Sequence, residues 1–358
     1  MTLRKLNKMN TKHEEVKEYY GEKLQTSDDL QTNACCTLEP PPTYIQEILN
    51  DIHDEVMAKY YGCGLTIPYN LEGLKILDLG SGSGRDCFIA SKLVGQKGEV
   101  IGVDMTDSQL DVANKHIDYH TEKFGFQYSN VKFVKGNIDE LDKLGFEKGS
   151  FDLIISNCVI NLATDKQSVL NNAFELLKPG GEMYFSDVYS DRRISKELQN
   201  DPVLWGECLS GALYWNDFLN FSKKAGFTDP RVVESSEITI ENKELEEKVG
   251  DLEFFSVTYR LFKLDGLESD CEDYGQAVRY KGTIEGNSSS YNLDDHHNFP
   301  KGKMEAVCGN TYKMLNESRF AEHFEFFGTW DTHYGIFEGC GGNIPFDKST
   351  ATGDPSCC

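Results

Sequence analysis

Residues 74–86, Leu-Lys-Ile-Leu-Asp-Leu-Gly-Ser-Gly-Ser-Gly-Arg-Asp, decide the fold of this chain. The apolar run from Ile76 to Leu79 predicts a buried strand, and the three glycines at alternate positions after it predict a tight turn. A helix is expected to begin after Ser83. Strand, glycine turn and helix in this order form a cradle for a nucleotide-containing cofactor, because glycine lets the backbone approach a ligand closely. A glycine-rich turn without a ligand is the alternative.

The spacing of the glycines indicates which cofactor the cradle holds. Gly80, Gly82 and Gly84 form a G-x-G-x-G pattern, and Arg85 stands where a dinucleotide fingerprint has its third glycine. Asp104 ends the next apolar run, 24 residues after Gly80, where a carboxylate can accept hydrogen bonds from both ribose hydroxyls. The pattern resembles the first motif of the class I S-adenosylmethionine-dependent methyltransferases.

Beyond this motif, strands and helices alternate, which predicts an α/β fold with a parallel sheet and ligands at the carboxyl ends of its strands. The Lys178-Pro179-Gly180-Gly181 stretch is expected to form the turn before the fifth strand, as in methyltransferases. The predicted strands are 74–79, 99–104, 131–135, 151–156 and 182–187, with 231–240 and 253–263 completing the sheet. The predicted helices are 43–60, 85–93, 107–123, 139–144, 166–177 and 215–225.

Composition limits the class of protein. The chain has 358 residues and a formal net charge of −23, from 59 acidic and 36 basic residues. A protein this acidic repels polyanions, which argues against a nucleic-acid partner. No apolar run approaches the roughly 18 residues of a membrane span, and no secretory signal is visible at residues 1–10. We therefore expect a protein of the cytosol with no membrane partner.

Three regions are predicted. Residues 1–69 form an N-terminal segment with a helix and, before Pro40-Pro41-Pro42, a mobile loop that carries Cys35 and Cys36. Residues 70–264 form the cofactor-binding domain, with an insertion near 204–213. Composition changes after Leu264, so residues 265–358 are predicted to form a small C-terminal domain that ends in a flexible, cysteine-containing tail.

Eleven cysteines are many for a chain without a secretory signal. No zinc framework of C-x-x-C pairs is present, so any thiol site must be assembled by the fold. Cys63 stands between two glycines, Cys158 follows the fourth strand and Cys208 lies in the insertion. Burial as a small apolar side chain is the simplest interpretation of each cysteine alone. Their common placement around the cofactor strands favours a shared site.

Four separated motifs resemble those of the arsenite methyltransferases, and the animal branch is the nearest likeness. The likeness extends over about residues 20–263 and includes Leu30-Gln31-Thr32-Asn33-Ala34-Cys35. The four motifs are Tyr61-Gly62-Cys63-Gly64, Leu79-Gly80-Ser81-Gly82-Ser83-Gly84-Arg85-Asp86-Cys87, Ser156-Asn157-Cys158-Val159-Ile160-Asn161-Leu162 and Trp205-Gly206-Glu207-Cys208-Leu209-Ser210-Gly211-Ala212.

The resemblance implies that the thiolates of Cys63, Cys158 and Cys208 bind trivalent arsenic, a soft element that prefers sulfur. It implies that arsenite arrives as a glutathione complex and that its lone pair attacks the sulfonium methyl group. Cys35 would form a disulfide with Cys63 during turnover, which glutathione or thioredoxin reduces; Cys36 is an alternative to Cys35. The remaining cysteines, including Cys271, Cys308 and Cys340, have no predicted role.

We expect a monomeric enzyme that needs no general base, because the lone pair of arsenic is the nucleophile. Two other hypotheses remain: a different small-molecule methyltransferase, and a non-enzymatic protein that binds soft metals. The predicted site residues fall into two groups. The catalytic residues are Cys35, Cys63, Cys158 and Cys208, of which Cys63, Cys158 and Cys208 are the arsenic ligands. The S-adenosyl-L-methionine-binding residues are Tyr61, Gly80, Ser81, Gly82, Gly84, Asp104, Met105, Asn137, Ile138 and Asn157.

Overall fold

The computed structural model describes Glu14, Val16, Tyr19 and residues 41–60, 62, 64–240 and 242–340. The predicted loop with Cys35 and Cys36, the positions of Tyr61 and Cys63, and the C-terminal tail lie outside the described residues. None of the helices in the described part of the chain has the length and apolarity needed to cross a membrane.

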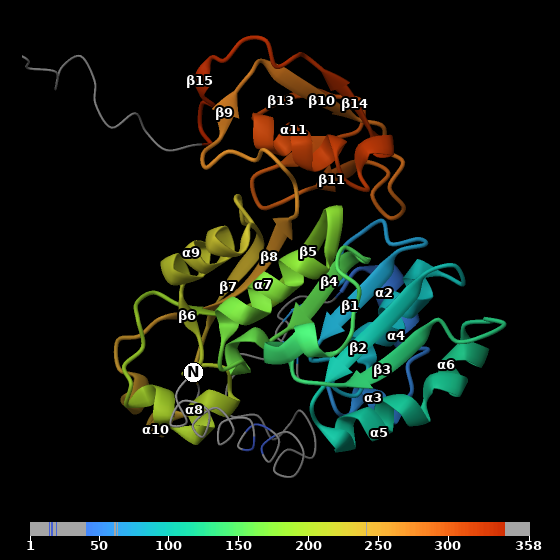
Figure 1. Cartoon of the computed structure of the whole chain (residues 1–358), viewed down its shortest axis with the longest axis vertical. Helices are drawn as coiled ribbons and strands as arrows, with labels where there is room; N and C mark the ends of the chain where they lie inside the picture. The colour runs from blue at the N-terminus through green and yellow to red at the C-terminus, as the bar shows by residue number, and fades with distance from the viewer. Residues whose placement is uncertain are drawn as a thin grey trace, which may run out of the picture.

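A large mixed sheet forms the centre of the fold (Figure 1). Its strand order is β3-β2-β1-β4-β5-β8-β7, with β6 paired to β5. The first five of these strands run parallel, β8 runs antiparallel to them, and β7, which is antiparallel to β8, runs in their direction again. This arrangement confirms the predicted α/β class. The strands are β1 (Lys75–Leu79), β2 (Glu99–Asp104), β3 (Val131–Lys135), β4 (Phe151–Asn157), β5 (Leu177–Ser190), β6 (Leu213–Tyr214), β7 (Arg231–Ile238) and β8 (Phe254–Phe262).

Both faces of this sheet are buried, which explains the continuous apolar runs. Alternate residues of β1 enter different cores: Leu77 and Leu79 pack with α7 and α9, whereas Ile76 packs with α2 and α4. The helices that cover the sheet are α2 (Thr43–Leu49), α4 (Arg85–Val94), α5 (Asp107–Lys115), α6 (Ile117–Lys123), α7 (Lys166–Leu176) and α9 (Trp215–Ala225).

Three predicted elements differ from the structure. Instead of one helix over 107–123, α5 and α6 are separated at His116. The predicted turn at 178–181 lies within the longer strand β5. A six-residue 3-10 helix, η4 (Ile138–Lys143), stands where a helix over 139–144 was predicted.

The predicted helix over 43–60 is also wrong. It divides into α2 and the short α3 (Asp54–Met57), because the His53 ring accepts the backbone N–H of Glu55 and stacks on His116 at 3.7 Å between ring centroids. A side chain that accepts an N–H group of the first turn marks the start of a new helix. The stacked partner comes from a distant part of the sequence, so local periodicity did not reveal the break.

A cap built from residues after β5 lies near the carboxyl ends of the parallel strands. It contains the 3-10 helix η6 (Leu198–Asn200), α8 (Pro202–Gly206) and α10 (Lys243–Val249). Asp201 caps α8 by accepting the N–H groups of Val203 and Leu204. The cap has its own apolar cluster, which includes both Cys158 and Cys208.

The C-terminal region lies beside β5 and β8, at the top of Figure 1. Its core is aromatic and contains Tyr280, Tyr291 and Phe324. It consists of the sheet β13-β10-β14 and the pairs β11-β12 and β15-β9. Its elements are β9 (Glu272–Asp273), β10 (Gln276–Tyr280), β11 (Ser290–Asn292), β12 (Asn298–Pro300), β13 (Met304–Val307), α11 (Gly309–Asn316), β14 (Phe324–Phe327) and β15 (Gly335–Ile336).

A buried ion cluster connects this region to the large sheet. Glu182 on β5 is fully buried and accepts two hydrogen bonds from Arg260 on β8, at 2.9 and 3.1 Å. Arg319 of the C-terminal region lies 2.5 Å from the same carboxylate. Burial alone would raise the pKa of Glu182, but the two guanidinium groups outweigh this effect and hold the pKa below its usual range.

Replacement of Glu182 with Ala is expected to lower the free energy of unfolding by about 3–5 kcal/mol, because it leaves buried guanidinium groups without their carboxylate. Urea unfolding measures the change. Glu99→Ala is the matched control, since the ion pairs of Glu99 with two lysines are partly exposed and contribute about 1 kcal/mol or less. An equal loss in both variants would contradict this role of the cluster.

Candidate functional site

A pocket opens at the carboxyl ends of the parallel strands, where the sequence predicts ligand binding. It is bordered by the turn after β1, the ends of β2 and β4 and the start of η4. The lining residues that the sequence predicted are Gly80, Ser81, Gly82, Asp104, Met105, Asn137, Ile138, Asn157 and Cys158.

Gly84 does not line this pocket, although it belongs to the same motif. It is the N-cap of α4 with φ +91°, and a Cβ placed on it would lie 2.6 Å from the Phe133 ring. Glycine is therefore required at this position for the close packing of the helix start on β3. Its role is to shape the turn.

The turn itself depends on two glycines with left-handed backbone. Gly80 has φ +73°, and a Cβ there would lie 2.4 Å from the Val159 side chain. Gly82 has φ +51° and faces open space, with its nearest neighbour 3.9 Å from a Cβ position. The backbone at Gly82 thus borders the pocket without a side chain in between, which is what close approach of a ligand requires.

Asp104 joins this turn to the end of β2. Its carboxylate accepts the N–H of Gly82 at 3.0 Å and the N–H of Thr106 at 2.8 Å. Burial raises the pKa of Asp104, and the two N–H groups act in the opposite direction. A carboxylate has about four lone-pair sites, so a ligand's hydroxyls can still be accepted.

Ser81 borders the pocket, and its side chain packs over β2. The hydroxyl is buried without a hydrogen-bond partner among the described residues, and a Cβ on Gly102 would lie 2.7 Å from it. The open glycine turn and the ribose-spaced carboxylate together fit S-adenosylmethionine.

Asn157 and Asn137 are held by the protein's own groups. The amide of Asn157 donates to the carbonyl of Gly64 at 2.8 Å and to Asp86 Oδ2 at 3.0 Å, which ties β4 to the segment before β1. Asn137 accepts the N–H of Asp139 and so caps η4. Both residues shape the pocket that they line.

Cys158 and Cys208 have an unusual backbone. With Asn70, they are the non-glycine residues of the described chain at positive φ, +55° for Cys158 and +62° for Cys208. The Cys208 thiol donates to the Cys158 carbonyl at 3.2 Å, and both side chains are buried. Left-handed backbone at such residues costs about 1–3 kcal/mol and is concentrated at functional sites. Cys158 is also part of a disulfide bond in this structure.

Two buried ionisable groups accompany these cysteines. Burial lowers the pKa of Lys166 to about 8, and the carboxylate of Asp187 opposes this shift, as does Cys208. Burial raises the pKa of Asp187 to about 7, although it accepts the N–H groups of Val188 and Asn161.

The sequence missed several pocket residues. The Arg85 guanidinium lies 3.1 Å from the centre of the Tyr60 ring and pairs with Asp86 at 2.7 Å. Asp78, beneath the turn, has a pKa raised to about 8 by burial and by Asp86. The missed lining residues are Val16, Lys59, Tyr60, Gly62, Asp78, Ser83, Arg85, Asp86, Thr106, Gln109, Gly136, Val159, Leu162 and Ala163.

Comparison with known proteins agrees with this fold and pocket. Residues 70–226 match the family described as "Methyltransferase domain", and the sheet is that of a class I S-adenosylmethionine-dependent methyltransferase. Residues 274–340 match the family described as "Arsenite methyltransferase C-terminal domain". The fold and the pocket thus define an S-adenosylmethionine-dependent methyltransferase.

Three relatives identify the family. An arsenite methyltransferase of Aquipseudomonas alcaligenes is 56% identical over 97% of this chain and 100% of its own length. The Homo sapiens arsenite methyltransferase is 49% identical over 87% of this chain and 82% of its own. The crystal structure of CrArsM, an arsenic(III) S-adenosylmethionine methyltransferase from Chlamydomonas reinhardtii, matches with a TM-score of 0.81 and 53% identity, over 84% of this chain and 100% of its own. The chain belongs to the arsenite methyltransferase family.

Asp104→Ala is expected to weaken S-adenosylmethionine binding by about tenfold or more, because a charged acceptor of hydrogen bonds is removed. Isothermal titration calorimetry measures the dissociation constant. Asp107→Ala, an exposed aspartate three residues later, is the matched control and should bind normally. Unchanged affinity in Asp104→Ala would refute the ribose assignment.

Proposed function

We propose that this protein methylates trivalent arsenic to mono- and dimethylated arsenicals, with Cys63, Cys158 and Cys208 as the arsenic ligands. The observation that carries the proposal is the pair of buried cysteines with left-handed backbone, Cys158 and Cys208, at the carboxyl ends of the strands. Cys158 lines the same pocket as the glycine turn. The third ligand, Cys63, follows from the family resemblance and lies outside the described residues.

The chain's own residues prepare both reactants. S-adenosylmethionine supplies an electrophilic methyl group on a positively charged sulfur, which the arsenic lone pair attacks. The Gly80–Gly82 turn and Asp104 would hold the cofactor, as the pocket geometry suggests. The main contribution of the protein is to bring nucleophile and methyl group into line.

The thiol ligands need to be reduced and deprotonated to bind arsenic. Cys158 is disulfide-bonded in this structure, so it binds arsenic only after reduction. This supports a thiol reductant, glutathione or thioredoxin, as co-substrate. In this proposal arsenite arrives as a glutathione complex and the enzyme acts as a monomer in the cytosol.

No base is required in this mechanism, because arsenic attacks with a lone pair that carries no proton. A carbon, nitrogen or oxygen methyltransferase needs a group that accepts a proton. The three aspartates that line the pocket already have partners. Asp86 pairs with Arg85 and accepts from Asn157, Asp78 accepts from the Cys87 thiol, and Asp104 accepts two backbone N–H groups. This engagement favours arsenic over those acceptors.

The proposal predicts that Cys158→Ser and Cys208→Ser abolish methyl transfer to arsenite, because the ligands that hold arsenic are lost. Purified protein, S-adenosylmethionine, glutathione and arsenite are combined, and the arsenic species are separated by chromatography with elemental detection. Cys87→Ser is the matched control, since Cys87 is equally buried but donates to Asp78 beneath the turn. Cofactor affinity is measured in every variant.

Methylated arsenic that forms only with the cofactor, and is absent in both cysteine variants, supports the proposal. Full activity of Cys158→Ser or Cys208→Ser would rule out the thiol-site mechanism. Intact cofactor binding without methylated arsenic in the unmodified enzyme would point to another small-molecule acceptor.

Cys35→Ser is expected to reduce the first methylation of arsenite more than the methylation of monomethylarsenite, because the resemblance gives Cys35 a redox role in the cycle. Initial rates with the two substrates provide the comparison, and Cys36→Ser is the control from the neighbouring position. Equal losses in both steps would count against a step-specific role for Cys35.

A further inference from the structure

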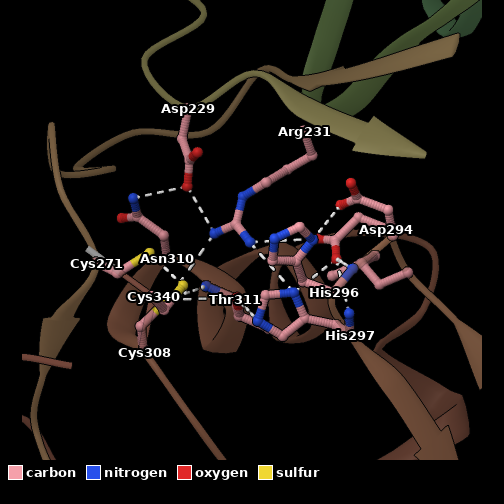
Figure 2. Close-up of polar contacts among 12 residues, drawn as sticks. Asp229, Arg231, Cys271, Asp294, His296, His297, Cys308, Asn310, Thr311 and Cys340 are labelled. Carbon is pink, nitrogen blue, oxygen red and sulfur yellow. Dashed lines mark hydrogen bonds and ion pairs between the residues drawn. The ribbon is translucent and has the colours of Figure 1, made fainter. Parts of the chain in front are cut away.

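A second group of cysteines meets in the C-terminal region. Cys271, Cys308 and Cys340 have sulfur atoms that all lie within 4.8 Å of one another, and those of Cys271 and Cys340 are 2.7 Å apart (Figure 2). Cys308 is buried, and the other two are half-buried. None of the three lines the pocket described above.

The fold brings these residues together from three separate segments. Cys271 precedes β9, Cys308 is the N-cap of α11, and Cys340 follows β15. β15 pairs with β9, and the N–H of Phe337 donates to the carbonyl of Cys271 at 2.8 Å. The sulfur cluster is therefore built on paired backbone and the start of a helix.

Two hydrogen-bond donors lie next to the sulfur of Cys308. The Arg231 guanidinium donates to Cys308 Sγ at 3.8 Å, and the backbone N–H of Thr311 donates to the same sulfur at 3.5 Å. Figure 2 shows the three cysteines gathered on one side of this guanidinium.

Arg231 is itself fixed in place. It pairs with Asp229 at 2.7 Å and with Asp294 at 3.1 Å, and it starts β7 of the large sheet. Asn310, in the first turn of α11, donates to the same Asp229 carboxylate. A buried cation with two carboxylates is thus held next to the sulfurs by residues on both sides of the domain contact.

We propose that Cys271, Cys308 and Cys340 form a second site for trivalent arsenic, separate from the pocket at the strand ends. Three sulfur ligands suit arsenic, which forms a pyramidal unit and keeps a lone pair. Structural zinc instead takes four ligands. In the described part of the chain, no fourth Cys, His, Asp or Glu lies within 4.8 Å of all three sulfurs. His297 contacts Cys340 alone among the three, and its Nδ1 is held by Asp294 at 2.7 Å.

Binding requires no oxidant or reductant. Arsenous acid and three thiols give the tris-thiolate and three waters: As(OH)₃ + 3 RSH → As(SR)₃ + 3 H₂O. Each As–O bond is replaced by an As–S bond, and each thiol proton leaves with a hydroxide. The choice of arsenic as ligand rests on the proposed function, but binding itself can be measured without methyl transfer.

The test counts bound arsenic in the full chain. Reduced protein is incubated with arsenite, and native mass spectrometry gives the number of arsenic atoms per chain. The variant with Cys271→Ser, Cys308→Ser and Cys340→Ser is expected to bind one arsenic atom fewer than the unsubstituted protein. Cys87→Ser, which removes a buried cysteine outside both groups, is the matched control and should bind the same number.

The proposal would be overturned by an unchanged arsenic count in the triple variant. Zinc in place of arsenic on the purified protein, or a Cys271–Cys340 disulfide that persists in excess reductant, would overturn it as well. The protein with Cys158→Ser and Cys208→Ser should keep the C-terminal arsenic and lose methyl transfer. Loss of the C-terminal arsenic in that protein would also overturn the proposal, independently of whether the unsubstituted protein methylates arsenite.

A second measurement covers the case in which the triple variant does not fold, as judged by circular dichroism. Cys340→Ser removes one half-buried ligand and is expected to weaken arsenic binding at this site at least about tenfold, since loss of even an outer partner has that effect on metal sites. X-ray absorption of the protein with Cys158→Ser and Cys208→Ser should show three sulfur neighbours around arsenic. Oxygen neighbours there would overturn the proposal.

Discussion

The hydrogen bond from the Gly82 N–H to Asp104 is the constraint on which the pocket depends. It closes the turn after β1 onto the end of β2, and it forms only because Gly80 and Gly82 adopt left-handed backbone. Val159, which follows β4, packs against Gly80 where a Cβ would stand. This one turn therefore holds together the ends of β1, β2 and β4. The other residues of the pocket are positioned by these strand ends.

The parts of the fold that depend on buried apolar runs were predicted well. The bounds of β2 and β3 agree with the sequence prediction, because buried parallel strands are continuous apolar segments bounded by polar residues. The helix over 43–60 was wrong because His53 caps α3 and stacks on a residue far away in the sequence. The C-terminal region was not assignable, since its strands have two to five residues and show no readable period.

The site was predictable only in part, because several of its features arise from contacts between residues that are far apart in the sequence. The glycine spacing and Asp104 are local signals, and the structure places them around one pocket. The backbone strain at Cys158 and Cys208 is a tertiary property that no residue pattern reveals. The lowered pKa of Lys166 and the Ser81 hydroxyl, which has no partner among the described residues, likewise depend on burial that only the folded chain creates.

The two groups of cysteines are attached to different ends of the large sheet. Cys158 follows the carboxyl end of β4, whereas the C-terminal region is fastened by Glu182, near the amino end of the parallel part of β5. Arg231 couples β7 to this region through Asp294 and at the same time contacts Cys308. Arsenic bound by three sulfurs is neutral, so it would join the segments that carry Cys271, Cys308 and Cys340 without adding a charge beside Arg231 and without touching the glycine turn. A ligand that binds only the folded chain stabilises it, so occupation of these sulfurs would act on the stability of the C-terminal region and, through the Arg231 contacts, on its attachment to the large sheet.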